Sequence, residues 1–284
     1  LRAVRHAVAL QLSMDSNTIN WLKEASADLP LSSLERQRDE FFRILEGRKV
    51  DTAVRILDQF GLLELILPEV TALKHEAQPP YAVDVWEHTI ATLSWLEKLI
   101  DLLAAEYHEE KGANLVLGLA ALYLGTYRDQ LRRHFDQPLV SGRTVRGDLF
   151  LAALLHDTGK PGKKTVDSAG RTHFYGHEML SADIARQRAR AMVLSNKEME
   201  RIELLVRQHL RIHLMAKAGV DVNQRSIYRY FRDTGQAGID LCFLSLADTL
   251  AMDGVTILPV RWERELTICR QVLQAWFDQY DQVV

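Results

Sequence analysis

The sequence has few of the features that mark several large classes of protein. Its 284 residues include only two cysteines, Cys242 and Cys269. They stand far apart and fit neither a disulfide framework nor a cysteine-rich zinc site. No apolar run approaches the roughly 20 residues that span a bilayer, and no signal peptide is visible. These absences predict a cytoplasmic protein that does not enter the membrane.

An excess of charge of one sign is also missing. The 35 Lys and Arg residues nearly balance the 38 Asp and Glu residues, and the net charge is −3. The chain as a whole therefore has no basic character of the kind that binds nucleic acid, so any such contact must be local. Strand-like alternation is scarce, and apolar residues recur at helical spacing. We therefore predict an all-α fold.

The pattern divides the chain into helical segments joined by short polar loops. Residues 1–70 are expected to form four or five short helices. The segment Asp15–Thr18 offers N-cap residues for one of them, and Ser32 and Glu35 have the spacing of a capping box for another. Pro79 and Pro80 mark a linker, and Asp84 caps the next helix. Further helices are expected at residues 102–124, 148–155, 177–191, 196–213, 226–233, 238–252 and 259–280, with a loop at 160–176.

One short stretch carries an unusual polar pair. The apolar segment that ends at Leu155 is followed at once by His156 and Asp157, and then by Gly159 and Lys160. An imidazole and a carboxylate at a buried helix end are costly unless they find partners. A divalent metal ion is one such partner.

Other metal-capable side chains lie at widely separated places, each among apolar neighbours. The full candidate set is His88, His156, Asp157, His177, His209 and Asp248. Mixed nitrogen and oxygen donors suit Mn, Fe, Co, Ni or Zn better than Ca or Mg. Six donors are too many for one open catalytic ion and suit two ions about 3.5–4 Å apart, with Asp157 as the bridge. Each histidine taken alone also fits a structural residue with satisfied hydrogen bonds, and the chain has ten.

The motifs around these residues resemble the HD superfamily of metal-dependent phosphohydrolases. The relevant segments are Val85–Thr89, Leu154–Pro161, Phe174–Glu178 and Val206–Leu210. The residues of these segments are similar to those of one particular HD domain. It is the domain that follows the RNA-binding neck in bacterial tRNA nucleotidyltransferases (CCA-adding enzymes) and poly(A)-polymerase-like proteins. Segments before residue 70, namely Leu1–Ala7, Ser33–Glu40 and Leu57–Leu63, resemble that neck. The resemblance covers residues 1 to about 215.

The resemblance implies a helical neck at residues 1–75, followed by an HD-domain helical bundle at 76–284. The bundle would carry an inserted helical segment near 100–146 and a C-terminal extension. The inserted segment would either shape the mouth of the site or be inert padding. No nucleotidyltransferase head is found before His88. Either that head lies upstream of Leu1, or the chain is a stand-alone relative.

The resemblance also implies roles for the candidate residues. His88, His156 and Asp157 would bind the first ion with Asp248, for which Asp253 is the competitor. His177 and His209 would bind the second ion. Lys160 would lie near the phosphate as a catalytic charge, or be an ordinary solvated lysine. His213 is a ligand, a residue behind a ligand, or a structural histidine. His173 contacts substrate or is a loop residue.

The implied function is metal-dependent hydrolysis of phosphomonoesters or phosphodiesters, with nucleotides or RNA 3′ ends as substrates and tRNA as a possible partner. The alternative is an RNA-binding body whose HD domain is only a scaffold. Local basic residues could contact RNA phosphates, or form solvated helix faces. They are Arg2, Arg5, Arg36, Arg38, Arg186, Arg188, Arg190 and the aromatic-rich segment 225–232.

Overall fold

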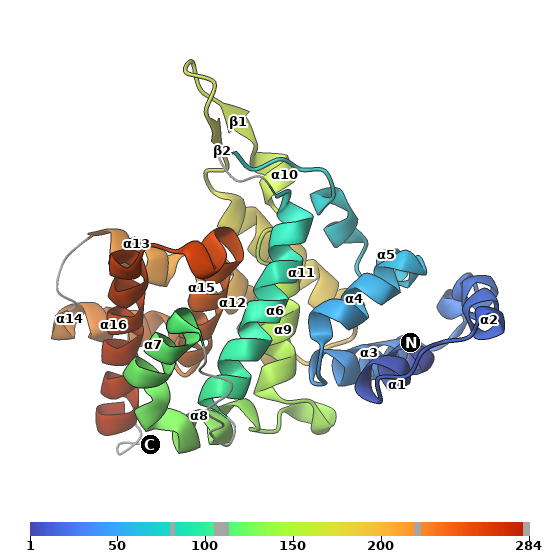
Figure 1. The fold of residues 1–284 in the computed structure, drawn as a ribbon, viewed down its shortest axis with the longest axis horizontal. Coiled ribbons are helices and arrows are strands. Elements are labelled where there is room, and N and C mark those ends of the chain that lie inside the picture. The colour runs from blue at the N-terminus through green and yellow to red at the C-terminus, as the bar shows by residue number, and fades with distance from the viewer. Residues whose placement is uncertain (80–82, 105–113, 219–222, 281–284) are drawn as a thin grey trace.

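The computed structural model describes residues 1–79, 83–104, 114–218 and 223–280 (Figure 1). The predicted all-α fold is confirmed: within these ranges the chain is helical apart from loops and one short hairpin. The hairpin pairs β1 (Thr165–Val166) with β2 (Thr172–His173) in antiparallel register. None of the described helices combines the length and the apolarity that crossing a membrane requires.

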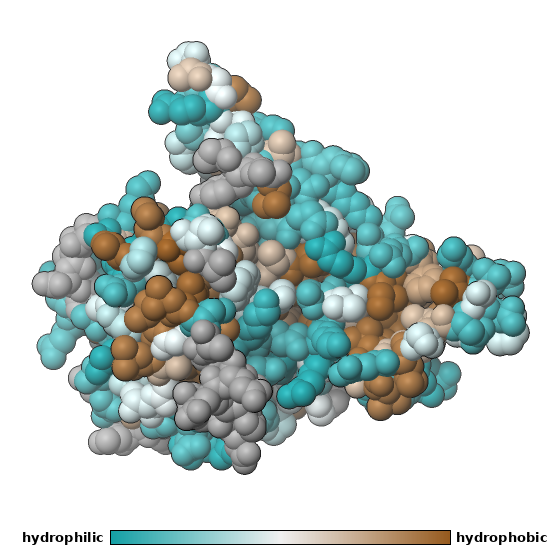
Figure 2. Space-filling model, viewed as in Figure 1, coloured by the Kyte–Doolittle hydropathy of each residue, from teal (hydrophilic) through white to brown (hydrophobic). Residues whose placement is uncertain are grey.

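The first part of the chain forms a small helical layer. Its helices are α1 (Arg2–Ala9), α2 (Ser16–Ser26), α3 (Leu34–Leu45), α4 (Val50–Gln59) and α5 (Leu62–Ile66), with 3-10 turns at Leu29–Leu31 and Pro68–Leu73. Asp15 caps α2 as predicted. Apolar side chains gather on the surface at this end, where Leu10, Leu31 and Leu34 are exposed (Figure 2).

The remaining helices form the bundle that holds the candidate site. They are α6 (Val85–Leu103), α7 (Leu115–Leu124), α8 (Arg128–Phe135), α9 (Val145–Leu155), α10 (Lys160–Lys163), α11 (His177–Ala191), α12 (Asn196–Gln208), α13 (Arg211–Ala218), α14 (Gln224–Thr234), α15 (Ala237–Asp253) and α16 (Pro259–Ala275). Asp84 caps α6 through the backbone N–H of Glu87, as predicted. Single 3-10 turns at Gly125–Tyr127, Val140–Gly142 and Gly254–Thr256 and a final π-helical turn at Trp276–Tyr280 complete the described elements.

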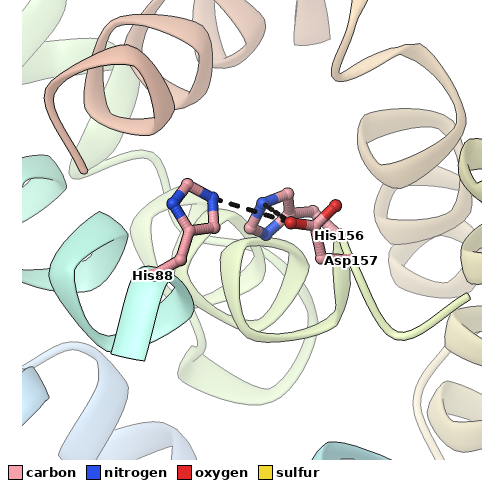
Figure 3. A group of neighbouring side chains, drawn as sticks. All are labelled: His88, His156 and Asp157. Atoms are coloured by element: carbon pink, nitrogen blue, oxygen red, sulfur yellow. Dashed lines mark ion pairs between the residues drawn. The ribbon is translucent and has the colours of Figure 1, made fainter. Parts of the chain in front are cut away.

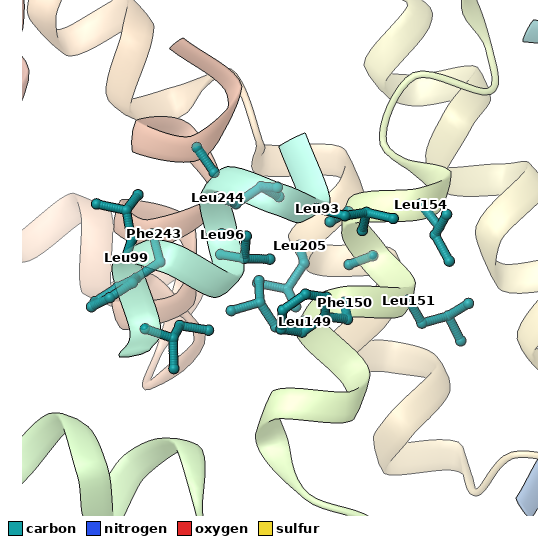
Figure 4. Close-up of a cluster of buried hydrophobic side chains, with 14 of the residues drawn as sticks. Leu93, Leu96, Leu99, Leu149, Phe150, Leu151, Leu154, Leu205, Phe243 and Leu244 are labelled. Carbon is teal, nitrogen blue, oxygen red and sulfur yellow. The ribbon is translucent and has the colours of Figure 1, made fainter. Parts of the chain in front are cut away.

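The core of the bundle lies between α6, α9, α12 and α15. Leu93 and Leu96 of α6 belong to the same buried cluster as Leu149 and Phe150 of α9, and all four side chains are fully buried (Figure 4). Burying each such side chain contributes about 1.5–3 kcal/mol. This packing fixes the ends of these helices relative to one another, and the candidate site is built from those ends.

Three sequence predictions of local structure were wrong. Ser33, not Ser32, caps α3, because the Ser32 hydroxyl donates to Leu29 O. The expected helix at 196–213 is broken after Gln208, because the carbonyl of Val206 accepts from the His209 ring. The loop at 160–176 contains the hairpin, whose turn is held by local hydrogen bonds to Asp167 rather than by an apolar pattern.

The inserted segment lies away from His88. Residues 105–113 fall outside the described ranges, so the predicted helix at 102–124 is tested only in part. The guanidinium of Arg128 donates to the carbonyl of Leu102 at the far end of α6. The indole of Trp262 on α16 donates to Val116 O at 3.0 Å. Two pockets open beside the candidate site, which is described below, and residues 114–146 line neither of them.

Candidate metal centre

The structure brings all six candidate ligands together at the ends of five helices. His88 lies in the first turn of α6, and His156 and Asp157 directly follow α9. His177 opens α11 and His209 follows α12. Asp248 lies near the C-terminal end of α15. All six are buried, with at most 8% of any residue exposed.

Asp157 lies between two groups of histidines. Its Oδ2 is 3.6 Å from His88 Nε2 and 3.2 Å from His156 Nε2 (Figure 3). Its Oδ1 is 3.2 Å from His177 Nε2 and 4.0 Å from His209 Nε2. Each set of three offers donor atoms close enough together to hold one metal ion. One carboxylate with an oxygen toward each set has the geometry of a bridging ligand.

Asp248 completes the first group. Its Oδ1 lies 2.8 Å from His88 Nε2 and 3.8 Å from His156 Nε2. Asp253, the competing candidate, instead forms an ion pair with Arg261. The structure therefore places Asp248, and not Asp253, beside the histidines.

Backbone carbonyls orient three of the imidazole rings. The Nδ1 atoms of His156, His177 and His209 contact the carbonyl oxygens three residues earlier, at 2.8, 2.8 and 2.6 Å. A ring that donates its Nδ1–H in this way presents Nε2 as its other nitrogen, and the Nε2 atoms face Asp157. His156 and His209 follow the C-terminal ends of α9 and α12, where carbonyls are accessible, whereas the carbonyl beside His177 belongs to the loop before α11.

Several atoms at the centre lack a hydrogen-bond partner although they are buried. They include both ring nitrogens of His88 and Nε2 of His156. Asp157 Oδ2 accepts no hydrogen bond of good geometry either, but the Lys160 ammonium lies 2.7 Å from it. Although His88 Nε2 and Asp248 Oδ1 are close, the contact does not have hydrogen-bond geometry. Buried polar atoms without partners are rare because they cost about 1–3 kcal/mol each. Their lone pairs converge on common points, which is what a divalent ion needs.

The surroundings keep the carboxylates ionised and one imidazole neutral. Burial opposes the charge of Asp157, but the positive charges of His156 and Lys160 outweigh it and hold its pKa well below the usual value. The pKa of Asp248 is lowered in the same way, by His213 and His88 against burial. Burial, reinforced by repulsion from His156, lowers the pKa of His209 to about 3. Although burial opposes its charge, the carboxylates of Asp157 and Asp248 raise the pKa of His156. Carboxylate and neutral imidazole are the forms that bind metal, so an ion at this ring would displace a proton.

Gly159 lets the His-Asp turn approach the start of α11. A Cβ at this position would lie 2.5 Å from His177 O and 2.7 Å from Ser181 N, both backbone atoms. The Gly159 N–H donates to Ser181 Oγ at 2.8 Å. The missing side chain thus brings Asp157 within reach of His177.

Lys160 is held beside the centre rather than solvated. Its Nζ lies 2.7 Å from Asp157 Oδ2 and 3.0 Å from Gln78 Oε1. The sequence left the role of His213 open between three alternatives. In the structure it lies behind a candidate ligand, since its Nε2 is 2.8 Å from Asp248 Oδ2. His173 is outside the centre, with its ring 3.0 Å from Asp167 Oδ2.

Most of the basic residues considered for RNA contact have protein partners. Arg2 and Arg5 pair with Glu40, Arg186 with Glu203, and Arg188 with Glu69. Arg38 pairs with its neighbour Asp39. In the segment 225–232, Tyr230 and Phe231 are buried and Tyr228 is exposed. The buried aromatic stripe on a solvated helix is therefore the better description of that segment.

Sequence reasoning missed Gln78 and Glu265. Gln78 contacts Lys160 from the preceding linker, and Glu265 lies 3.5 Å from His213 Nδ1. Neither residue belongs to a sequence motif, and only the tertiary fold brings it to the site.

The helical bundle brings together two groups of side chains around one buried aspartate, and each group could hold a metal ion. The comparison with family models names the family. The HD domain model matches residues 85–253, which is more than half of the chain, and the chain belongs to this family. A second model, described as the probable RNA and SrmB-binding site of polymerase A, matches residues 11–74.

Curated relatives share both parts. The chain is 28% identical over 262 residues to the CC-adding tRNA nucleotidyltransferase of Thermus thermophilus. It is 26% identical over 260 residues to the A-adding tRNA nucleotidyltransferase of Deinococcus radiodurans. These alignments cover 90% and 89% of this chain, but only 49% of each relative. A bifunctional uridylyltransferase/uridylyl-removing enzyme of Ruegeria pomeroyi is 28% identical over 75% of the chain and 20% of the relative. The chain thus spans about half the length of the tRNA nucleotidyltransferases that it matches.

Proposed function

We propose that this chain is a metal-dependent phosphohydrolase that cleaves phosphate esters of nucleotides or RNA 3′ ends. The observation that carries the proposal is the position of Asp157 between two histidine groups. A domain with a purely mechanical role does not need buried lone pairs that converge without partners, because each costs stability. We assign the helices of residues 1–75 to an RNA-binding neck and residues 76–284 to the hydrolytic domain.

The donor set fits two divalent ions. His88, His156 and Asp248 would hold one ion, His177 and His209 the other, with Asp157 shared. Imidazole and carboxylate donors favour Mn, Fe, Co, Ni or Zn over Mg. When bound, the ions supply an activated water and positive charge for the phosphate oxygens.

The protein's own residues would orient the metal ligands and supply charge for this reaction. In hydrolysis the oxygen of water forms a bond to phosphorus, the ester P–O bond breaks, and the leaving alcohol takes a proton. Backbone carbonyls fix the rings of His156, His177 and His209 before substrate arrives. Lys160, beside Asp157, supplies a positive charge where a phosphate would lie. Burial of the centre strengthens these electrostatic contacts.

A second candidate function is supported by the match to the tRNA nucleotidyltransferases over half their length. The chain would then be an RNA-binding body that positions tRNA for a catalytic part outside it. Under this function the metal centre would be structural, and its loss would leave RNA affinity unchanged. The two functions differ in whether the chain itself turns over a phosphate ester.

The test is hydrolysis of bis(p-nitrophenyl) phosphate by the purified chain with Mn²⁺, Ni²⁺ or Co²⁺, together with elemental analysis of bound metal. We expect turnover with at least one ion and up to two ions per chain. Asp157→Ala should remove both metal and activity because it breaks the shared ligand. Asp253→Ala is the matched control and should retain both. No turnover with any ion, and no bound metal, would overturn the proposal.

A further inference from the structure

Two pockets open beside the candidate centre, one on each side. The first, here called the hairpin pocket, has a volume of about 450 Å³ and includes Lys160, Phe174, Tyr175 and His177. The second, here called the α16 pocket, has a volume of about 440 Å³. Its polar lining residues are His213, Lys217, Asp248, Arg261, Arg264 and Glu265. Of the six candidate ligands, His177 reaches the first pocket and Asp248 the second.

The two pockets are neighbours, because Leu210 and Met252 line both of them. A ligand that occupied both pockets would extend past these two side chains and past the candidate ligands His177 and Asp248. Such a ligand must be longer than a single phosphate ester, since each pocket alone is large enough for a small molecule.

Tyr175 presents an aromatic face at the rim of the hairpin pocket. It is 77% exposed although it stands two residues before a buried candidate ligand. Its ring stacks on His173, with centroids 5.0 Å apart and planes 12° from parallel. Asp167 in turn holds His173. Gly176, at φ +76°, allows the sharp turn between Tyr175 and His177. The Tyr175 ring is thus held by His173 and exposed to solvent. Two residues of backbone, at most about 7 Å, separate it from the candidate ligand His177.

The α16 pocket presents two cations that no carboxylate in the described ranges neutralises. Arg264 and Lys217 form no ion pair with any residue in the described ranges, whereas Arg261 pairs with Asp253. Both Arg264 and Lys217 line the same pocket as Asp248, a candidate ligand of the centre. In a chain of net charge −3, such a cluster favours an anionic ligand at this place.

We propose that the two pockets form one groove for single-stranded nucleic acid, in which a base stacks on Tyr175 and a flanking phosphate binds Arg264 and Lys217. The phosphate between them would lie at the centre. This inference rests on the proposed function and adds a substrate of more than one nucleotide to it. An exposed aromatic face beside a cationic groove is how proteins bind single strands without reading sequence.

The first experiment measures binding without catalysis. A fluorescein-labelled RNA tetranucleotide is titrated into the protein in EDTA and followed by anisotropy, together with a matched tetranucleotide lacking one base. Tyr175→Ala should weaken binding of the intact RNA roughly 5- to 100-fold, and Tyr175→Phe should restore it, because stacking needs the ring alone. Tyr228→Ala, another exposed tyrosine, is the control and should have no effect.

The salt dependence of the same binding separates the two halves of the groove. Arg264→Ala should reduce the slope of log K against log salt by about 0.7, the value for one phosphate contact to a single strand. Tyr175→Ala should leave the slope unchanged. Arg270→Ala, on the same helix but outside the pocket, is the matched control.

The second experiment compares substrates. Tyr175→Ala and Arg264→Ala should lower kcat/KM by at least about 5-fold for a trinucleotide, which has a second phosphate beside the scissile one. Neither variant should change hydrolysis of glycerol 2-phosphate, which has no base and no second phosphate. Equal loss on both substrates, or no change in RNA binding, would overturn the groove while leaving the hydrolase intact. Absence of turnover in the unmodified chain would instead count against the proposed function, and the EDTA binding results would still decide the groove.

Discussion

His213 Nε2 lies 2.8 Å from Asp248 Oδ2, while the other oxygen of Asp248 lies 2.8 Å from His88 Nε2. One carboxylate thus faces the centre with one oxygen and a supporting histidine with the other. His213 is itself placed between two carboxylates, since its Nδ1 is 3.5 Å from Glu265 Oε1. Burial opposes its positive charge, but the contacts with Asp248 and Glu265 raise the pKa of His213 to about 10. His213 therefore orients Asp248 and balances its charge.

We expect His213→Gln to weaken metal binding by roughly 10- to 100-fold, the usual effect of losing a residue that supports a ligand. Glutamine retains a donor for Asp248 without the charge, so the fold should be kept. His213→Ala should be worse and should also lower the free energy of unfolding, because Asp248 and Glu265 would remain buried without their cation. Competition with a chelator measures the affinity. Unchanged affinity in both variants would show that Asp248 needs no support.

Gly159→Ala should separate the two halves of the centre. The new methyl group would collide with the backbone of His177 and Ser181, so α11 must shift. We expect loss of the ion held by His177 and His209, retention of the ion held by His88 and His156, and about 1–3 kcal/mol of destabilisation. Elemental analysis should therefore give about half the metal content of the unmodified protein. Gly125→Ala, where a Cβ meets only an arginine side chain at 3.6 Å, is the control.

The sequence could predict the candidate ligands better than the residues that hold the side chains around them in place. An ionisable group among apolar neighbours needs a partner, and this pattern can be recognised from the sequence alone. It singled out His88, His156, His177, His209 and Asp248. The roles of Gln78 and Glu265 depend on where the linker and α16 pack, which no local pattern records. Helix ends were also hard to predict: the break after Gln208 arises from the His209 ring competing for a backbone carbonyl.

Asp148 should make stability depend on pH. It is fully buried, neither of its oxygens has a hydrogen-bond partner, and burial, with repulsion from Glu198, raises its pKa to about 8. The folded protein therefore keeps this carboxyl protonated where the unfolded chain ionises it. Stability should fall as pH rises between about 4 and 8, by up to about 1.4 kcal/mol per pH unit from this group.

Urea unfolding of Asp148→Asn at pH 5.5, 7 and 8.5 tests this prediction. Asparagine mimics the neutral acid and does not titrate, so the variant should lose less stability than the unmodified protein over this range. Asp129→Asn changes an exposed aspartate on α8 and should follow the unmodified protein. Parallel curves for all three proteins would show that Asp148 is ionised in the fold.

Lys160→Met should change metal binding and catalysis in opposite directions. The Lys160 ammonium lies 2.7 Å from Asp157 Oδ2, so it competes with a cation for that oxygen and repels it. Its removal should leave metal affinity unchanged or raise it. The same charge would stabilise a phosphate in the hairpin pocket, where a charged hydrogen bond is worth about 1.5–3 kcal/mol, so kcat/KM should fall by roughly 10- to 100-fold. Lys163→Met, on the same short helix but exposed, should change neither quantity. A loss of metal together with activity would mean that Lys160 acts by holding Asp157 in place, and not by contacting the phosphate.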